Sequence, residues 1–266
     1  MRRLLSLCCA LLAGSAFAQT GPSNPEPLWE GAVGLVARYS PNYLGSSTFA
    51  ARAIPGLFLR YGRFSVTTTG GFVTRRNDDV ARGFTADLVR RDDLRVSLSL
   101  RTDGGRDAGN DPALAGLPDV RPTFRARLGV VQKWGDGWRV TAGLSPDLLG
   151  RGGGVTADLA LGHEWRVAPT MLANLSAGGT WANGRDMQRH FGITPTQSAL
   201  SGHPVYSARA GLRDIGVGAG LRIDISREWL GFMGVGTSRL LGSTLDSPLT
   251  QRPSSWGVNG GLAWRF

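Results

Sequence analysis

Residues 255–266 alternate strictly between an apolar face, aromatic at both ends, and a face of small or polar residues. Period-2 alternation is typical of a β-strand whose two faces meet different surroundings. A transmembrane strand needs about 9–11 residues with aromatic girdles at both interfaces, and this spacing matches that need. The apolar face consists of Trp256, Val258, Gly260, Leu262, Trp264 and Phe266, opposite Ser255, Gly257, Asn259, Gly261, Ala263 and Arg265. We therefore expect the closing strand of a membrane barrel here.

About twelve runs of the chain alternate in this way. One of the clearest is 123–134, where Phe124 and Leu128 stand on one face and Arg125 and Arg127 on the other. Such runs, bounded by glycine, proline and charged residues, indicate strands. The predicted strands are 29–39, 51–61, 64–74, 82–90, 94–102, 123–134, 138–148, 154–165, 170–181, 217–226, 229–239 and 255–266.

The connections between these runs alternate in length. The tight ones are 62–63, 91–93, 135–137, 166–169 and 227–228, and the longer links are 40–50, 75–81, 103–122, 149–153, 182–216 and 240–254. Outer-membrane barrels combine short periplasmic turns with longer outer loops and an even strand number, whereas a soluble sandwich has no reason to alternate its loop lengths. The pattern therefore predicts an all-β fold: an antiparallel transmembrane up-and-down β-barrel of about twelve strands, with both termini periplasmic.

The N-terminal residues predict export. Arg2 and Arg3 precede a short apolar run, and Ala16-Phe17-Ala18 matches a cleavage site, as in a secretory signal peptide. We expect three regions: a signal peptide at 1–18, a periplasmic N-terminal segment at 19–28 and an outer-membrane β-barrel at 29–266. Both cysteines, Cys8 and Cys9, fall inside the leader, so we expect no disulfide or thiolate metal site in the exported protein.

Composition narrows the class of protein. The mean hydropathy is −0.10, and no segment after the leader approaches 18 consecutive apolar residues, so any membrane span must be made of strands. The formal net charge of +10 comes almost entirely from arginine, because Lys133 is the one lysine. For an exported barrel, this charge predicts contact with membrane lipid and lipopolysaccharide phosphates rather than with nucleic acid.

Three stretches, 39–66, 190–221 and 240–266, carry a distinctive set of motifs. The set comprises Tyr43-Leu44-Gly45-Ser46, Gln197 with Ser201-Gly202 and Tyr206, Asp246-Ser247-Pro248, and Trp264-Arg265-Phe266. With these motifs the chain resembles the MipA/OmpV family. The resemblance implies an outer-membrane barrel and, from the family's namesake, a scaffold linking a lytic transglycosylase to a murein synthase. Other members resemble porin-like or adhesive proteins, and the resemblance implies no catalytic residues.

Arginine predominates on the face that we expect to point into the barrel. Two interpretations stay open: an anion-preferring pore, or a set of ion pairs that holds the interior together, which we favour because buried charges need partners. The candidate lumen residues are Arg38, Arg60, Arg95, Arg125, Arg127, Arg139, Asp158, Arg222, Asp224 and Arg265; Arg52, Arg101, Glu30, Asp87 and Glu164 share their face.

A partner at the periplasmic rim would meet the tight turns, where Arg63, Arg91, Asp136 and Arg227 stand. These turns are too short for a specific interface of about 1,200–2,000 Å². Two interpretations of the proline-containing segment 19–28 therefore stay open: an untethered tail, or, as our hypothesis for partner binding, an extended recognition peptide.

Catalytic motifs are incomplete. His163-Glu164 begins a zinc-binding H-E-x-x-H pattern, but position 167 is valine. The link 182–216 contains His190, His203, Asp186 and Ser201, which together suggest a barrel hydrolase, although nothing in their spacing specifies a triad. We therefore predict a non-enzymatic envelope scaffold without a cofactor. A passive porin-like channel is the second hypothesis and a barrel hydrolase the third; the sequence leaves the oligomeric state open.

Overall fold

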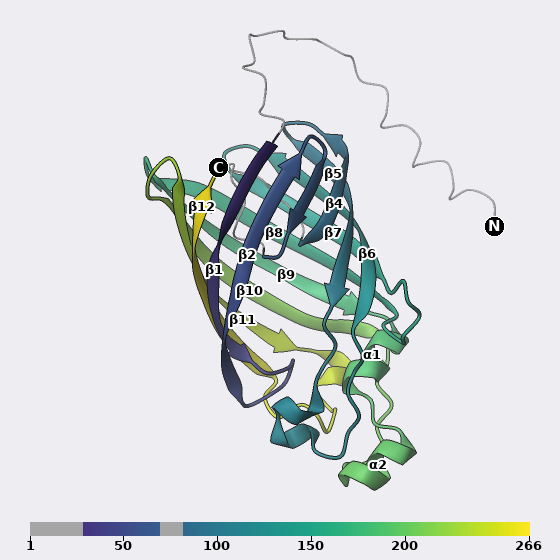
Figure 1. Cartoon of the computed structure of the whole chain (residues 1–266). Coiled ribbons are helices and arrows are strands. Elements are labelled where there is room, and N and C mark those ends of the chain that lie inside the picture. Colours follow the sequence, from purple (N-terminus) through teal and green to yellow (C-terminus); the bar gives the residue numbers. More distant parts are fainter. Residues whose placement is uncertain (1–28, 70–81) are drawn as a thin grey trace, which may run out of the picture.

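A computed structural model describes residues 29–69 and 82–266 and shows twelve antiparallel strands in a closed barrel (Figure 1). The predicted leader and segment 19–28 lie outside the described residues. The strands are β1 (Trp29–Pro41), β2 (Phe49–Tyr61), β3 (Phe64–Thr67), β4 (Gly83–Arg90), β5 (Leu94–Asp103), β6 (Thr123–Trp134), β7 (Trp138–Pro146), β8 (Val155–Ala168), β9 (Met171–Ala182), β10 (Gly211–Asp224), β11 (Trp229–Leu240) and β12 (Ser254–Arg265).

Each strand pairs with its neighbours in sequence, and β1 closes the sheet by pairing with β12. Across this seam Val33 lies opposite Trp264 and Arg38 opposite Asn259. The N–H of Gly31 donates to the carbonyl O of Phe266 at 3.0 Å, which extends the pairing past the end of β12. The predicted all-β barrel with about twelve antiparallel strands is therefore confirmed.

The predicted start of β10 was wrong. β10 begins at Gly211, six residues before the predicted start at 217, so the link before it spans 183–210. The pairing of β10 with β9 shifts register between Leu212 and Asp214. A bulge adds one residue to a strand, so the apolar and polar positions before it exchange places relative to those after it. The alternation therefore does not extend across the bulge, and the sequence pattern misses the first part of the strand. β3 ends at Thr67, so Thr68 and Thr69 lie outside the strand, and the rest of the predicted range, from 70 onward, lies outside the described residues.

The two ends of the barrel differ. At one end, here called the turn end, tight turns at 62–63, 91–93, 135–137, 169–170 and 225–228 join the strands. Gly62, Gly135 and Gly137 have positive φ angles of 54°, 52° and 90°, which suit glycine in such turns. The C-terminus also lies at the turn end, and the helices lie at the opposite, loop end (Figure 1).

The helices all belong to the longer links. They are η1 (Ala108–Asn110), η2 (Pro112–Leu114), α1 (Gly184–Phe191), α2 (Pro195–Ser201) and η3 (Gly242–Thr244). Among the described residues, no helix has the length and apolar character needed to cross a membrane.

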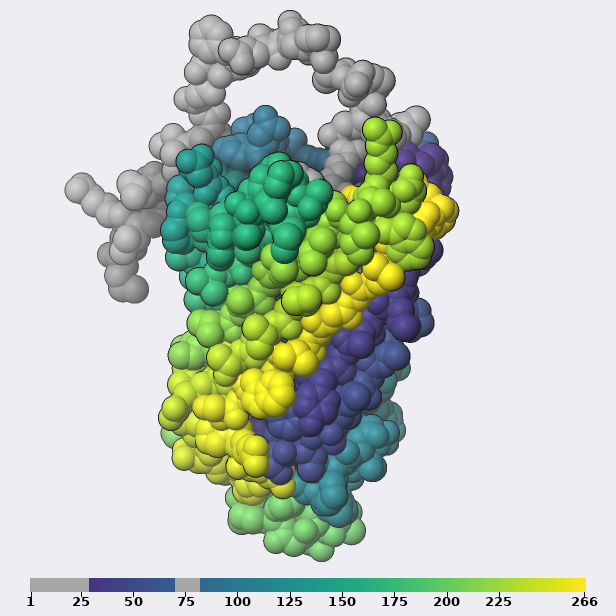
Figure 2. All heavy atoms as spheres, turned by 90° about the vertical axis from the view of Figure 1, so that its left-hand side faces the viewer, coloured from purple at the N-terminus to yellow at the C-terminus, as the bar shows by residue number. Residues whose placement is uncertain are grey.

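The outer surface of the wall is apolar. Leu35, Leu159 and Leu262 are each 47–60% exposed, although leucine normally avoids water. Aromatic rings gather toward the ends of the strands: Tyr39 packs against Trp256 from β12 at the loop end, with ring centroids 5.7 Å apart. Figure 2 shows the last strands crossing this wall diagonally. Apolar side chains with aromatic rings toward the strand ends are what an outer-membrane barrel presents to lipid.

Candidate functional site

The inward face is rich in ion pairs. Near the turn end, Arg60 Nη1 donates to Glu30 Oε1 at 2.9 Å, and both side chains are almost fully buried. Arg265 from β12 binds Asp224 in β10 at 3.0 Å, and Arg222 lies 3.4 Å from the same carboxylate. Beside them lies an apolar cluster from four strands, namely Ala32, Val36, Phe58, Leu230 and Ala263. Charge pairing and apolar packing together fill this side of the interior.

An ion pair in the middle of the barrel crosses over a strand. Arg127 in β6 binds Asp158 in β8 through both terminal nitrogens, and the Nη2–Oδ2 distance is 2.6 Å. The guanidinium passes over Gly143 of the intervening strand β7, where an added Cβ would overlap it. Glycine at 143 therefore makes room for this bidentate pair, which is the strongest form of arginine–carboxylate contact.

Asp186 in α1 connects the loop end to the wall. Its side chain is fully buried, and Oδ1 accepts from Arg125 Nη2 of β6 at 2.6 Å. Oδ2 lies 3.6 Å from Arg213 Nη1 of β10 and 3.7 Å from His190 Nδ1. Burial lowers the pKa of His190, although the Asp186 carboxylate opposes this shift. Asn183 caps α1 by accepting from the Asp186 N–H at 3.1 Å.

Four links, 42–48, 104–122, 183–210 and 241–253, form one packed unit that we call the cap. It holds two apolar clusters, and Tyr206 contacts both. Such clusters require side chains from links that are far apart in sequence, so the cap folds as a unit. The first cluster contains Ala182, Met187, Phe191, Ala208 and Leu240, and the second Leu114, Leu117, Ile193 and Leu249.

Hydrogen bonds tie the cap links together. The carboxylate of Asp111 accepts from the hydroxyl of Ser46 at 2.5 Å and from the hydroxyl of Thr48. Burial alone would raise the pKa of Asp111, but these bonds and one from the Ala113 N–H lower it below its ordinary value. The Tyr43 hydroxyl donates to the carbonyl O of Leu249 at 2.9 Å, and burial, with the charge of Asp111, raises the pKa of Tyr43 to about 12.

Three of the four motifs that carry the family resemblance meet in this cap, whereas Trp264-Arg265-Phe266 ends the chain at the turn end. Tyr43, Gly45 and Ser46 come from the first link, Tyr206 from the third and Ser247 from the fourth. The Tyr206 hydroxyl donates to the carbonyl O of Ser243 at 2.5 Å, and the Ser247 hydroxyl donates to that of Phe191 at 2.7 Å. Their scattered positions in the sequence thus converge on one end of the barrel.

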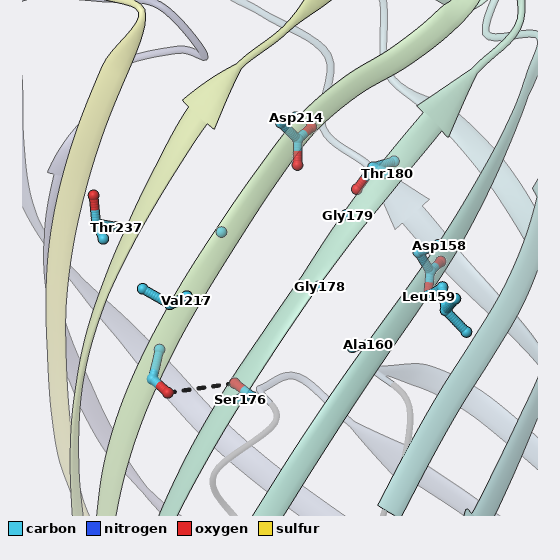
Figure 3. A pocket seen from close by; sticks show the side chains of 12 residues that line it. Asp158, Leu159, Ala160, Ser176, Gly178, Gly179, Thr180, Asp214, Val217 and Thr237 are labelled. Atoms are coloured by element: carbon cyan, nitrogen blue, oxygen red, sulfur yellow. Dashed lines mark hydrogen bonds between the residues drawn. The ribbon is translucent and has the colours of Figure 1, made fainter.

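A cavity of about 370 Å³ lies against the wall formed by β8, β9, β10 and β11 (Figure 3). Its polar lining includes Asp158, Ser176, Thr180 and Asp214. Thr180 is the register partner of both aspartates, so these three residues form one row across three strands. Asp214 accepts from Arg213 Nε at 2.7 Å. Since Arg213 also contacts α1, the cavity lies directly beneath the cap.

Most of the predicted lumen residues lie in ion pairs. Besides the pairs described above, Arg95 binds Asp87 at 2.7 Å, and Arg139 lies 3.9 Å from Glu164. Arg38, Arg52 and Arg101, which share their face, have no ion pair with a described residue; Arg52 and Arg101 donate instead to Asn42 and Ser145. The predicted rim residues Arg63, Arg91, Asp136 and Arg227 are exposed in the tight turns of the turn end.

The residues suggested for a hydrolase have separate partners. The Ser201 hydroxyl donates to the carbonyl O of Gln197 at 2.7 Å and accepts from the backbone N–H of His203. His203 Nε2 is bonded to the carbonyl O of Ala113, and His190 Nδ1 to that of Asp186. Neither imidazole is hydrogen-bonded to the serine hydroxyl, as a triad would need. Among the described residues, no group of three potential ligands could hold a metal ion.

Sequence reasoning missed the cap contacts. Asp103 stands one residue beyond the predicted strand 94–102, yet it binds Arg125 at 2.8 Å. Extending the alternation of that strand by one residue would have placed it on the inward face. Asp186 was considered only as a hydrolase candidate. Its position at the third residue after Asn183 marks a helix start, but nothing in the sequence pairs it with Arg125, 61 residues earlier.

Comparisons with known proteins agree with this architecture. The family model for MltA-interacting protein MipA matches residues 33–266. A comparison with curated proteins gives no match. An outer membrane channel from Pseudomonas putida F1 is similar in fold, with a TM-score of 0.50 at 12% identity over 94% of this chain and 100% of that chain. The outer membrane protein OmpT of Vibrio cholerae has a TM-score of 0.39 at 8% identity over 90% and 96% of the two chains.

Proposed function

Because this chain is an outer-membrane β-barrel that belongs to the family of the MltA-interacting protein MipA, we propose that it is a non-enzymatic interaction scaffold of the cell envelope. Its proposed partners are murein-remodelling enzymes: a lytic transglycosylase, as the family name suggests, and a murein synthase. The leader 1–18 would direct export, and the turn end would face the periplasm. Lipid and lipopolysaccharide would surround the wall.

The observation that carries this proposal is the ion-paired interior. Buried ion pairs such as Arg60–Glu30 and Arg127–Asp158 and the apolar cluster of β1, β2, β11 and β12 connect the strands from the inside, and the cap joins four links at the loop end. A rigid, internally cross-linked barrel is suited to presenting a fixed surface to a partner. The hydrolase candidates Ser201 and His203 are hydrogen-bonded to separate backbone carbonyl groups, which also favours a role without catalysis.

The partner surface would be the turn end. Arg63, Arg91, Asp136 and Arg227 are exposed there and form a mainly basic rim. Complementary charge on a partner speeds and orients its docking. Since turns of this length bury too little area for a stable complex, the segment 19–28, with Pro22, Pro25 and Pro27, would supply the remaining contacts.

Partner capture tests this proposal. The folded barrel carrying residues 19–266 is immobilised and exposed to detergent-solubilised envelope of the source organism, then washed at high salt to remove acidic passengers. We expect recovery of a murein hydrolase or synthase, and loss of it when residues 20–26 are deleted. A matched control exchanges Pro22, Pro25 and Pro27 for alanine at constant length. Recovery of lipopolysaccharide and assembly factors alone would contradict the scaffold function.

A porin-like channel is the second candidate. Arg38 and Arg52 are direct register partners on β1 and β2, and both are exposed without an ion pair among the described residues. Arginines that are not neutralised favour anions in a constriction. The bilayer experiment described in the Discussion separates the two functions.

A further inference from the structure

We propose that the cavity beneath the cap is a binding site for a small, neutral, polyhydroxylated molecule such as a monosaccharide. Its volume of about 370 Å³ falls within the range of small-molecule pockets, about 300–1,000 Å³. The site is separate from the proposed partner surface, because its lining runs from the middle of the barrel toward the loop end and does not include the tight turns.

The glycines of this wall support the proposal. At Gly178 and Gly216 an added Cβ would lie 2.7 Å from Ala160 Cβ and 2.9 Å from the carbonyl O of Thr237, so strand packing explains both residues. At Gly218 an added Cβ would meet only Ser176 Oγ at 3.5 Å and the carbonyl O of Val235 at 3.6 Å. These are ordinary contacts, and glycine weakens a strand. Gly218 is therefore not needed for packing, and its effect is to keep the cavity open.

The polar lining selects for hydroxyl groups. Thr180 supplies a hydroxyl that both donates and accepts, and no described residue binds it. The Ser176 hydroxyl has one long bond of 3.5 Å, to the carbonyl O of Gly218, which Figure 3 marks. Asp214 uses Oδ2 toward Arg213, which leaves Oδ1 as an acceptor. A ligand that carries several hydroxyls in a compact ring satisfies this mixture of donors and acceptors.

Charge argues against an ionic ligand. Asp158 is neutralised by the bidentate contact with Arg127, and Asp214 by Arg213. Both carboxylates therefore retain accepting capacity without an excess of negative charge to attract a cation. The two guanidinium groups are engaged with these carboxylates, so a phosphate or carboxylate would have to break an existing pair to bind.

The test uses saturation-transfer NMR on the folded barrel in lauryldimethylamine oxide, because a sugar-based detergent would compete for the site. D-Glucose is the probe, and glucose 6-phosphate is the charged comparison. We expect saturation transfer to glucose from the wild type. In Gly218→Leu, whose side chain would fill the cavity, the transfer should fall at least tenfold. The matched control is Ala219→Leu, which changes the neighbouring residue on the lipid-facing side and should leave the transfer unchanged.

A second variant tests the proposal even if Gly218→Leu does not fold. Thr180→Val keeps the shape but removes the hydroxyl, and we expect it to weaken glucose binding about fivefold, the effect of one neutral hydrogen bond. Heat-modified gel mobility checks the fold of each variant. The proposal is wrong if glucose receives no saturation from the wild type, if Thr180→Val binds glucose as the wild type does, or if glucose 6-phosphate binds more tightly than glucose. These outcomes leave partner capture at the turn end unaffected.

Discussion

Single buried charges decide how firmly the cap is held. Asp186 is the one carboxylate that contacts Arg125, Arg213 and His190 within the described part of the chain, and its side chain is inaccessible to water. An arginine that loses its buried partner keeps its desolvation cost without the compensating attraction. Removing one partner of a buried ion pair therefore destabilises a protein more than replacing both partners by apolar residues does.

Replacing Asp186 by alanine should lower the free energy of unfolding by about 3–5 kcal/mol, because the charge of Arg125 would be left with Asp103 alone. Urea unfolding of the refolded barrel, followed by tryptophan fluorescence, measures this loss. Asp92→Ala, an exposed change in a tight turn, serves as the control and should cost less than about 0.5 kcal/mol. Equal losses in the two variants would contradict the role given to Asp186.

Asp111 makes the stability of the cap depend on pH. Its pKa is lowered on folding, so its stabilising contribution is complete above the unfolded value of about 3.9 and is lost as pH falls toward and through the lower folded value. We expect Asp111→Asn to lower Tm at pH 7 but to differ little from the wild type at pH 2. The comparison of Tm at the two pH values checks this. A difference that stays the same at both pH values would show that the carboxylate charge is irrelevant.

At the scale of the strand, each side chain meets either lipid or the interior. Val258 and Asn259 are neighbours in β12, yet the first points outward and the second shares the face of Arg38 across the seam. An arginine on the lipid side near the middle of the membrane costs about 2–4 kcal/mol, whereas the interior of this barrel already accommodates many arginines. An arginine should therefore destabilise the barrel at the outward position Val258 and be tolerated at the inward position Asn259.

We expect Val258→Arg to reduce the folded fraction in lipid vesicles strongly and Asn259→Arg to reduce it little. Gel mobility of unheated samples reports the folded fraction. Similar losses for both variants would mean that the assignment of faces in β12 is wrong.

Element boundaries also show what the sequence can predict. The alternation of 94–102 and 123–134 located β5 and β6 to within one residue, because each face meets a uniform environment. It failed for β10, where the bulge at Leu212–Asp214 reverses the phase. The cap was not predictable in the same way. Its two α-helices are only seven or eight residues long, and they depend on contacts between distant links rather than on their own periodicity.

The whole molecule combines an ion-paired interior with a cap anchored to β6 and β10. The inward-facing arginines suggested either an anion-preferring pore or an ion-paired interior. The sequence could not distinguish the two, because the carboxylate partner of each arginine depends on the register between strands. Seven of the ten arginines expected on that face have a carboxylate partner. With its cap in place, the barrel should therefore conduct ions poorly.

In planar bilayers we expect the wild type to show no steady open conductance at moderate voltage. Asp186→Ala, which releases α1 from Arg125, should show frequent openings, and these should favour anions because Arg38, Arg52 and Arg101 carry no neutralising partner among the described residues. Single-channel recording with a salt gradient measures both properties. A large, steady conductance in the wild type would support the channel as the main function.

The convergence of four links in the cap has an immunological consequence. Contacts such as Ser46–Asp111, Tyr43–Leu249 and Ser247–Phe191 join residues that are 56 to 206 positions apart. A synthetic peptide copied from one link contains only one side of each contact and cannot hold the native shape. Antibodies raised against such peptides should recognise the denatured chain on a blot, whereas antibodies raised against the folded barrel should lose their epitopes on boiling.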